Sequence, residues 1–76
     1  MNPEDAIALT TLRRLLASGA ARELRLSAGL SLAEAGSAAG TSAATLCRWE
    51  SARRIPHGAV AVRYAHFLET LRKVTT

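Results

Sequence analysis

The fold of this chain is decided by the stretch LSLAEAGSAAGTSAATLCRWE, which spans residues 30–50. Ser31 stands three residues ahead of Glu34, which is the spacing of a capping box at the start of a helix. Gly40 ends that helix, since glycine readily takes the left-handed conformation that closes helices. Ser42 then caps a second helix that runs to the end of the stretch. The stretch therefore predicts two short helices joined by a tight turn.

Another helix begins near the N-terminus. Asn2 is a favourable N-cap residue, and Pro3 suits the first helical position because its missing N–H is not needed there. These residues and the helical spacing of the leucines that follow predict a helix over about 3–17. Glycine weakens a helix interior by about 1 kcal/mol. Gly19 therefore predicts either a separate second helix over about 19–28 or a single kinked helix.

The C-terminal part contains a loop and one more helix. Pro56 disfavours helix in the residue before it, so residues 53–58 are predicted to form a loop. A last helix is expected over about 59–73, with a buried stripe of Val60, Tyr64, Phe67, Leu68 and Leu71. No stretch alternates with the two-residue period of a strand. We therefore expect an all-α fold of four to five short helices in a single domain, residues 1–76.

The positive charge of the chain is unevenly distributed. The formal net charge is +4, with ten basic and six acidic residues. Residues 1–40 carry four of each sign, whereas residues 41–76 carry six basic and two acidic residues. A basic excess confined to one half of a small domain is typical of proteins that bind a polyanion such as nucleic acid.

Length and composition also exclude several function classes. A chain of 76 residues with no nucleophile–base pair is not expected to be an enzyme. Cys47, His57 and His66 do not have the spacing of a metal-ligand set, so we expect no metal and no cofactor. No apolar run approaches the roughly 20 residues of a membrane span, and no leader opens the chain. We therefore expect a soluble protein of the bacterial cytoplasm.

Two short helices with a glycine in the turn, the second carrying a basic residue, are typical of a helix-turn-helix, here at about 31–51. Three segments make the pattern specific: LRLSAGLSLAEAG at 24–36, GTSAATLCRWE at 40–50 and RRIP at 53–56. They resemble the Cro/repressor (XRE) family of helix-turn-helix regulators, and the resemblance covers about residues 20–71. It implies a lambda-repressor-like domain, here with an additional N-terminal helix.

The resemblance implies two structural roles and contains one departure. In the family, an arginine before the first glycine pairs with a glutamate at the end of the recognition helix; Arg25 and Glu50 stand at these positions. The family also has a very small residue where the two motif helices cross, here Gly36. It usually has glycine two residues after the glutamate, whereas this chain has Ala52. A left-handed backbone at that alanine would cost about 1 kcal/mol.

Helical geometry assigns roles on the second motif helix. Residues 43, 44, 47 and 48 share one face, whereas 45, 46 and 49 turn toward the body of the domain. We expect Ala43 and Ala44 to contact bases through their methyl groups and Arg48 to bind guanine O6 and N7. The expected phosphate contacts are backbone N–H groups at the two helix starts and two arginines after the second helix: Ser31, Leu32, Thr41, Ser42, Arg53 and Arg54.

The sequence thus predicts a sequence-specific double-stranded DNA-binding transcriptional regulator, of the Cro-like or small-repressor type found in phages and prophages. Two other functions stay open: a protein-interaction module such as an antitoxin, and an architectural or recombination-directionality factor that bends DNA. A strong dependence of affinity on salt distinguishes DNA binding from a hydrophobic protein interface. A homodimer on DNA also stays open, with the helix at 3–17 or the last helix as its interface.

Overall fold

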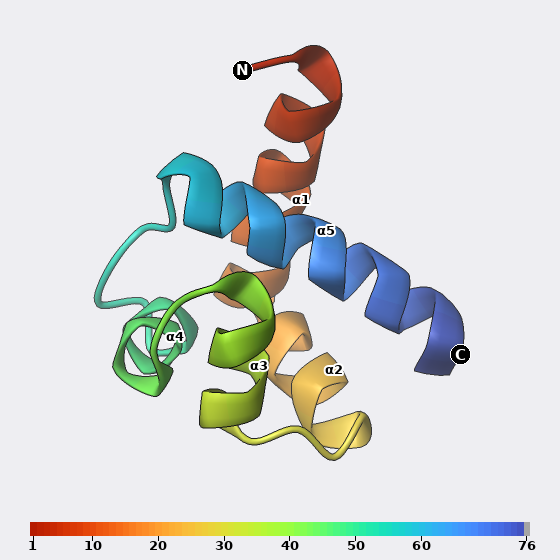
Figure 1. The fold of residues 1–76 in the computed structure, drawn as a ribbon, viewed down its shortest axis with the longest axis vertical. Coiled ribbons are helices and arrows are strands. Elements are labelled where there is room, and N and C mark those ends of the chain that lie inside the picture. Colours follow the sequence, from red (N-terminus) through yellow and green to blue (C-terminus); the bar gives the residue numbers. More distant parts are fainter. Residues whose placement is uncertain (76) are drawn as a thin grey trace.

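A computed structural model, which describes residues 1–75, shows how the chain is arranged (Figure 1). Five helices follow one another: α1 (Pro3–Ser18), α2 (Ala20–Ser27), α3 (Leu32–Ala39), α4 (Ala43–Glu50) and α5 (Gly58–Thr75). These residues contain no strand, so the predicted all-α fold is confirmed. No helix in this part of the chain is both long and apolar enough to cross a membrane.

The N-terminal region forms two helices and not one kinked helix. Gly19 adopts a left-handed backbone with φ of 84°, and its amide donates to the carbonyl of Leu16. Side chains other than glycine rarely adopt this conformation, so the chain turns here. At the other end of α1, Asn2 Oδ1 accepts a hydrogen bond from the Asp5 amide at 2.8 Å, as its expected N-cap role requires. The open alternative at Gly19 is therefore resolved in favour of two helices.

The start of α3 has the capping box that the sequence predicts. Ser31 Oγ accepts from the Glu34 amide at 3.0 Å, and Glu34 Oε1 accepts from the Ser31 amide at 2.9 Å. The hydrogen bond from the Ser31 amide, which is the larger cause, and the Ser31 side chain stabilise the carboxylate and lower the pKa of Glu34. Ser42 caps α4 by accepting from the Thr45 amide at 3.2 Å. Local hydrogen bonds thus determine where both motif helices begin.

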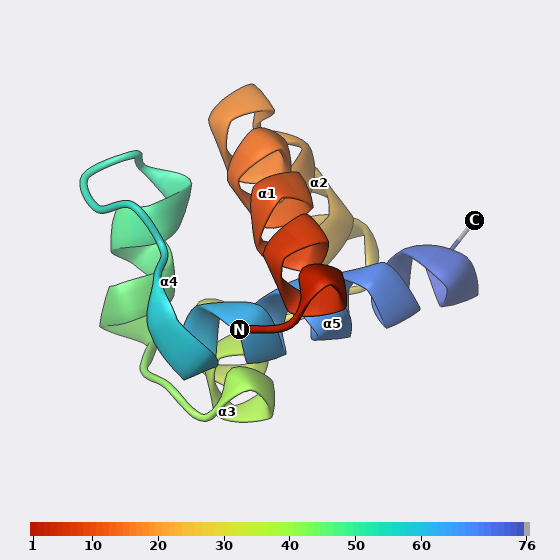
Figure 2. The same cartoon turned by 90° about the horizontal axis from the view of Figure 1, so that it is seen from above.

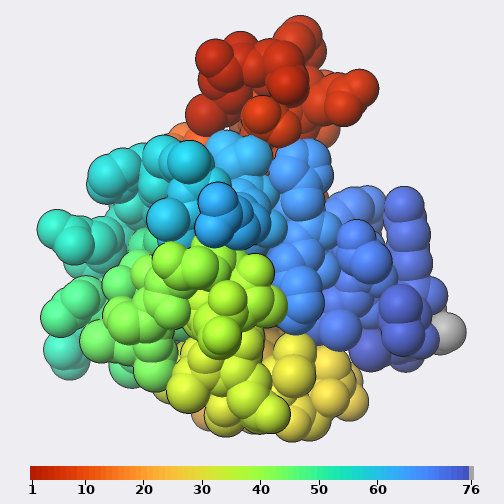
Figure 3. All heavy atoms as spheres, viewed as in Figure 1, coloured from red at the N-terminus to blue at the C-terminus, as the bar shows by residue number. Residues whose placement is uncertain are grey.

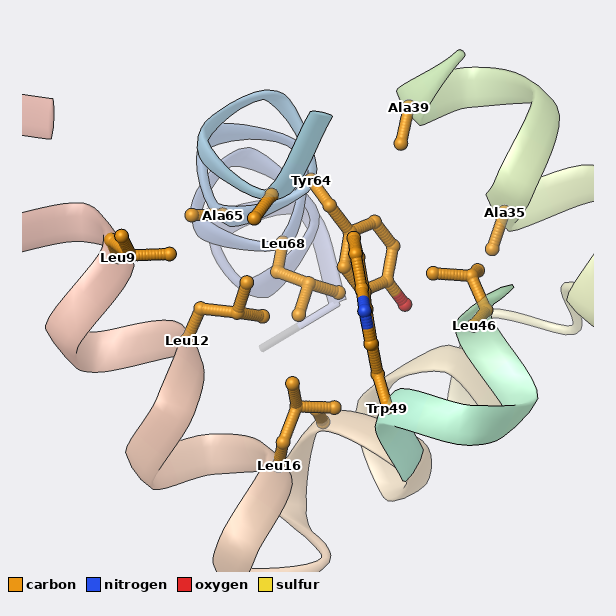
Figure 4. Close-up of a cluster of buried hydrophobic side chains, with 12 residues drawn as sticks. Leu9, Leu12, Leu16, Ala35, Ala39, Leu46, Trp49, Tyr64, Ala65 and Leu68 are labelled. Atoms are coloured by element: carbon orange, nitrogen blue, oxygen red, sulfur yellow. The ribbon is translucent and has the colours of Figure 1, made fainter. Parts of the chain in front are cut away.

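The core lies where α5 crosses α1 and faces α3 and α4 (Figure 4). Tyr64 is fully buried at its centre, with its ring centroid 5.9 Å from that of Trp49 and 6.0 Å from that of Phe67. Its hydroxyl finds no hydrogen-bond partner among residues 1–75. The other large buried side chains are leucines: Leu9, Leu12 and Leu16 of α1, Leu46 of α4 and Leu68 of α5. On α5, Tyr64 and Leu68 are buried as expected, whereas Val60, Phe67 and Leu71 are partly buried and pack against the core. Ala61 and Ala65 are buried in addition.

The packing leaves α4 at one edge of the molecule, with α1, α2 and most of α5 on the same side of it and the first turn of α5 at its N-terminal end (Figure 2). The segment between α4 and α5 reverses direction and returns toward the N-terminal end of α4. The first turns of α1 project from the body at a different place (Figure 3). One face of α4 is therefore free of the other helices, whereas the loop that follows it is held against α1 at Pro56.

Candidate nucleic-acid interface

The outer face of α4 carries the side chains that the sequence assigned to it. Ala44, Cys47 and Arg48 are exposed, and Ala43 is half-buried. On the opposite face, Leu46 is fully buried and Trp49 is 5% exposed. Since a helix places residues three and four apart on the same side, Ser51 continues this outer stripe beyond Arg48. The stripe formed by Ala44, Cys47, Arg48 and Ser51 is called the α4 outer face below.

The orientation of α4 is held by an ion pair. Arg25 Nε donates to Glu50 Oε2 at 2.7 Å, and Arg25 Nη2 donates to Glu50 Oε1 at 2.9 Å. Arg25 Nη1 also donates to the Leu30 carbonyl at 2.8 Å. Both charged side chains are only 7% exposed, and the bonded carboxylate raises the pKa of Arg25. The pair expected between these residues is therefore present, and it joins α2 to the last turn of α4.

The absence of a side chain at Gly36 lets α3 pack closely against the turn before α4. A Cβ atom on Gly36 would lie 3.0 Å from the Ser42 carbonyl carbon and 3.1 Å from the Thr41 oxygen. The Thr41 amide donates back to the Gly36 carbonyl at 2.8 Å. The sequence predicts this contact between the two motif helices. In the structure it lies one step earlier, on the backbone of the turn at Thr41 and Ser42.

The amides at the helix starts are not all available to a ligand. The Ser31 amide is bound by Glu34, and the Thr41 amide is bound by Gly36. The amides of Leu32 and Ala43 stand at the first helical positions, where a helix offers no internal acceptor. Leu32 therefore remains a candidate donor for phosphate, whereas Ser31 and Thr41 can contribute only their side chains.

The exit from α4 is a left-handed turn built on alanine. Ala52 has φ of 60°, and its amide donates to the Trp49 carbonyl at 3.2 Å. The next amide, of Arg53, donates to the Arg48 carbonyl at 2.9 Å. This is the Schellman arrangement, which normally has glycine at the left-handed position. The strain considered for Ala52 is therefore present, and the turn delivers Arg53 and Arg54 to the protein surface.

Arg13 is a residue whose role the sequence did not reveal. The sequence pattern favours a solvated side chain, but Arg13 Nε and Nη2 donate to the Pro56 carbonyl at 3.1 and 2.9 Å. The two residues are 43 positions apart in the chain, so no local spacing predicts the contact. The hydrogen bonds fasten the loop after α4 to α1. They thereby fix the position of the segment that contains Arg53 and Arg54.

Arg22 is a second basic residue that sequence reasoning left unassigned. It lines a groove of about 350 Å³ together with Leu32 and with Cys47 and Ser51 of the α4 outer face. Its position three residues before Arg25 on α2 was the available signal, because this spacing puts both on the same side of the helix. The groove brings a positive charge and the start of α3 to one flank of α4.

No group of three His, Cys, Asp or Glu side chains within residues 1–75 is arranged to hold a metal ion. A comparison with protein-family models matches residues 18–75 to the family described as helix-turn-helix domain. The match takes in α2 to α5 and every candidate interface residue, and it leaves nearly all of α1 outside. No curated protein and no solved structure matches the chain.

Proposed function

Because the chain belongs to the helix-turn-helix domain family over residues 18–75, we propose that it is a sequence-specific double-stranded DNA-binding transcriptional regulator. In this proposal α4 enters the major groove and its outer face contacts the base edges. The protein acts by binding, not as an enzyme.

The observation that supports the proposal most is that the Arg48 side chain is exposed and its guanidinium has no partner within residues 1–75. This side chain lies on the α4 outer face. A guanidinium presents two parallel donors that match guanine O6 and N7 in the major groove. Ala44 stands one turn earlier on the same face and offers a methyl group for apolar contact with thymine.

Charge around α4 also supports a polyanionic partner. Its one carboxylate, Glu50, is neutralised by Arg25, so α4 offers no free negative charge to repel phosphates. Arg22 lies on one flank, and Arg53 and Arg54 follow the C-terminal end. We assign Arg22 and these two arginines to phosphates on either side of the major groove, together with the Leu32 amide and the hydroxyls of Ser31, Thr41 and Ser42.

The finer assignment is to the Cro-like or XRE-type repressors of phages and prophages, acting in the bacterial cytoplasm. The segments at 24–36, 40–50 and 53–56 support it, and so does the pairing of Arg25 with Glu50. Binding as a homodimer to two half-sites follows from the same assignment, because the reading helices of a dimer meet successive major grooves.

The test is selection of bound duplexes from a random library, followed by affinity measurements on the selected and a scrambled duplex over a range of salt concentrations. We expect the selected duplex to bind more tightly, with log affinity falling by about 0.9 per phosphate contact for each unit of log salt. No enrichment and no salt dependence would favour a protein-interaction module. Strong bending of the duplex without sequence preference would favour an architectural factor.

A further inference from the structure

We propose that a groove along one flank of α4 is a phosphodiester site that gains strength when His57 is protonated. The groove has a volume of about 200 Å³ and is lined by Thr41, Thr45, Trp49, Arg54, His57 and Val60. The proposal rests on the proposed function, because the phosphodiester is that of the DNA backbone. It makes DNA affinity depend on pH.

The groove is assembled from three parts of the fold. Thr41 comes from the turn before α4, Thr45 from the first turn of α4, and Val60 from the first turn of α5. Arg54 and His57 come from the connecting loop, which returns toward the N-terminal end of α4 (Figure 2). The hydrogen bonds from Arg13 to the Pro56 carbonyl fix this loop to α1 at the residue before His57. Both groove residues of the loop are exposed, so a ligand outside the protein can reach them.

The polar groups of the groove suit an anion. Two hydroxyls, a guanidinium and an imidazole line it, and no carboxylate does. Hydroxyl and guanidinium groups are the usual donors to backbone phosphates in protein–DNA complexes. The Ser42 hydroxyl lies 3.2 Å from that of Thr45 and extends the donor set toward the helix start. Trp49 and Val60 are the apolar residues that line the groove.

The position of the groove identifies its ligand as DNA backbone and not a free anion. It adjoins Thr41 and Thr45, whereas the α4 outer face with Arg48 lies on the next side of the same helix. A helix that lies in the major groove has a phosphate backbone along each flank. Arg22 lies on one flank of α4, where it can reach one backbone. The groove with Arg54 and His57 lies on the other flank, where it can reach the second backbone.

Charges around His57 couple its protonation to binding. Arg54 is the one permanently charged residue that lines the groove with it. From α5, Arg63 reaches the Ala39 carbonyl at 3.5 Å and covers Gly40, just before Thr41. A bound phosphodiester attracts the positive charge of a protonated imidazole, so DNA binding is accompanied by proton uptake. Histidine is the side chain whose charge ordinarily changes between about pH 5 and 8.

The chain offers a matched control, because its only other histidine lies elsewhere. His66 Nε2 lies 2.9 Å from Asp5 Oδ1, in a contact between α5 and α1. The experiment measures the affinity of the whole chain for its selected duplex at about pH 6 and about pH 7.5, each over a salt series. Wild type, His57→Gln, His57→Lys and His66→Gln are compared. Any contribution from the Met1 amine or the Cys47 thiol is common to all four proteins.

We expect the wild type and His66→Gln to bind about two- to fivefold more tightly at the lower pH, the range of an exposed ion pair. Their salt slopes should be steeper there by about one phosphate contact. His57→Gln should bind at both pH values as the wild type does at the higher one. His57→Lys should bind tightly at both, because its charge does not change in this range.

A pH effect that survives in His57→Gln, or a wild type that binds equally at both pH values, would overturn the inference and leave the proposed function standing. A loss of the effect in His66→Gln would overturn it too and assign the pH dependence to the contact between α1 and α5. If the wild type binds no duplex at either pH and low salt, the proposed function fails and the inference fails with it.

Discussion

Arg25 and Glu50 form two parallel hydrogen bonds, at 2.7 and 2.9 Å, across 25 residues of chain. The bonds join α2 to the last turn of α4, the helix whose outer face carries Arg48. A bidentate pair defines both distance and orientation. This pair therefore contributes to the stability of the domain and also to the direction in which Arg48 points.

Glu50→Ala should destabilise the protein strongly, because it leaves the Arg25 charge buried without its partner. The expected loss in the free energy of unfolding is about 3–5 kcal/mol, seen as a large drop in Tm. Glu69→Ala is the matched control, since it removes an exposed pair with Arg72 at 3.1 Å and should cost less than about 1 kcal/mol. Equal Tm values for the two variants would show that the buried pair contributes no more than a surface one.

Gly36→Val should destabilise the fold and weaken DNA binding with it, because its side chain would press on the backbone at Thr41 and Ser42. Overpacking of this kind costs about 1–3 kcal/mol. Gly36→Ala adds only one carbon, 3.0 Å from its nearest neighbour, and should cost less. Urea unfolding of both variants measures the difference. A stable Gly36→Val protein that binds normally would mean that α3 and the turn are not in close contact.

Ala52→Gly should stabilise the protein by about 0.5–1 kcal/mol, because glycine removes the left-handed strain but adds freedom to the unfolded chain. Gly29→Ala is the reverse change. Gly29 has φ of 74°, and nothing lies within 4 Å of the position of an added Cβ, so only backbone strain is introduced. We expect its Tm to fall while that of Ala52→Gly rises. A fall in both would show that Ala52 makes contacts that outweigh its strain.

Arg48→Ala should reduce affinity for the selected duplex by about 1–3 kcal/mol and relax preference at one base position. Arg53→Ala and Arg54→Ala should weaken selected and scrambled duplexes alike and reduce the salt slope by about one unit per phosphate contact. The measurement is the affinity of each variant for both duplexes at several salt concentrations. Equal losses on both duplexes for Arg48→Ala would make it a phosphate contact. A loss confined to the selected duplex for Arg54→Ala would mean that the loop reads bases.

Tyr64→Phe should raise the free energy of unfolding by about 1 kcal/mol, because it removes a buried hydroxyl that is unpartnered within residues 1–75. Burial raises the pKa of Tyr64 from 10.0 to about 12, and the negative charge of Glu50 adds to the effect while Arg25 opposes it. Between these pH values the unfolded chain releases this proton and the folded protein keeps it. The stability of the wild type should therefore fall as pH rises through this range, by up to about 1.4 kcal/mol per pH unit.

Chemical denaturation of the wild type and Tyr64→Phe at several alkaline pH values isolates this contribution, because the remaining groups titrate in both proteins. The gap between them should widen in favour of Tyr64→Phe as pH rises above 10. A constant gap would show that Tyr64 titrates alike in the folded and unfolded chain. A wild type that is the more stable of the two at neutral pH would mean that the hydroxyl has a partner.

What the sequence determined by itself was the part of the structure that rests on local interactions. Caps such as Asn2, Ser31 and Ser42 act within three residues along the chain, so the starts of α1, α3 and α4 could be predicted from spacing alone. Helical periodicity likewise predicted which face of α4 is exposed. The pairing of Arg25 with Glu50 was anticipated only through the family resemblance, since no local rule connects α2 with α4.

The tertiary structure decided everything that depends on how the helices cross. The choice between one helix and two at Gly19 follows from its left-handed backbone, because both readings satisfy the same apolar spacing. The contact of Arg13 with the Pro56 carbonyl and the meeting of Arg54, His57 and Thr41 in one groove join distant segments. Such contacts form because the buried faces of α1, α4 and α5 pack around Tyr64 and thereby bring the loop beside α4. The residues that meet in this way follow no regular spacing in the sequence, so the sequence pattern alone does not predict their contacts.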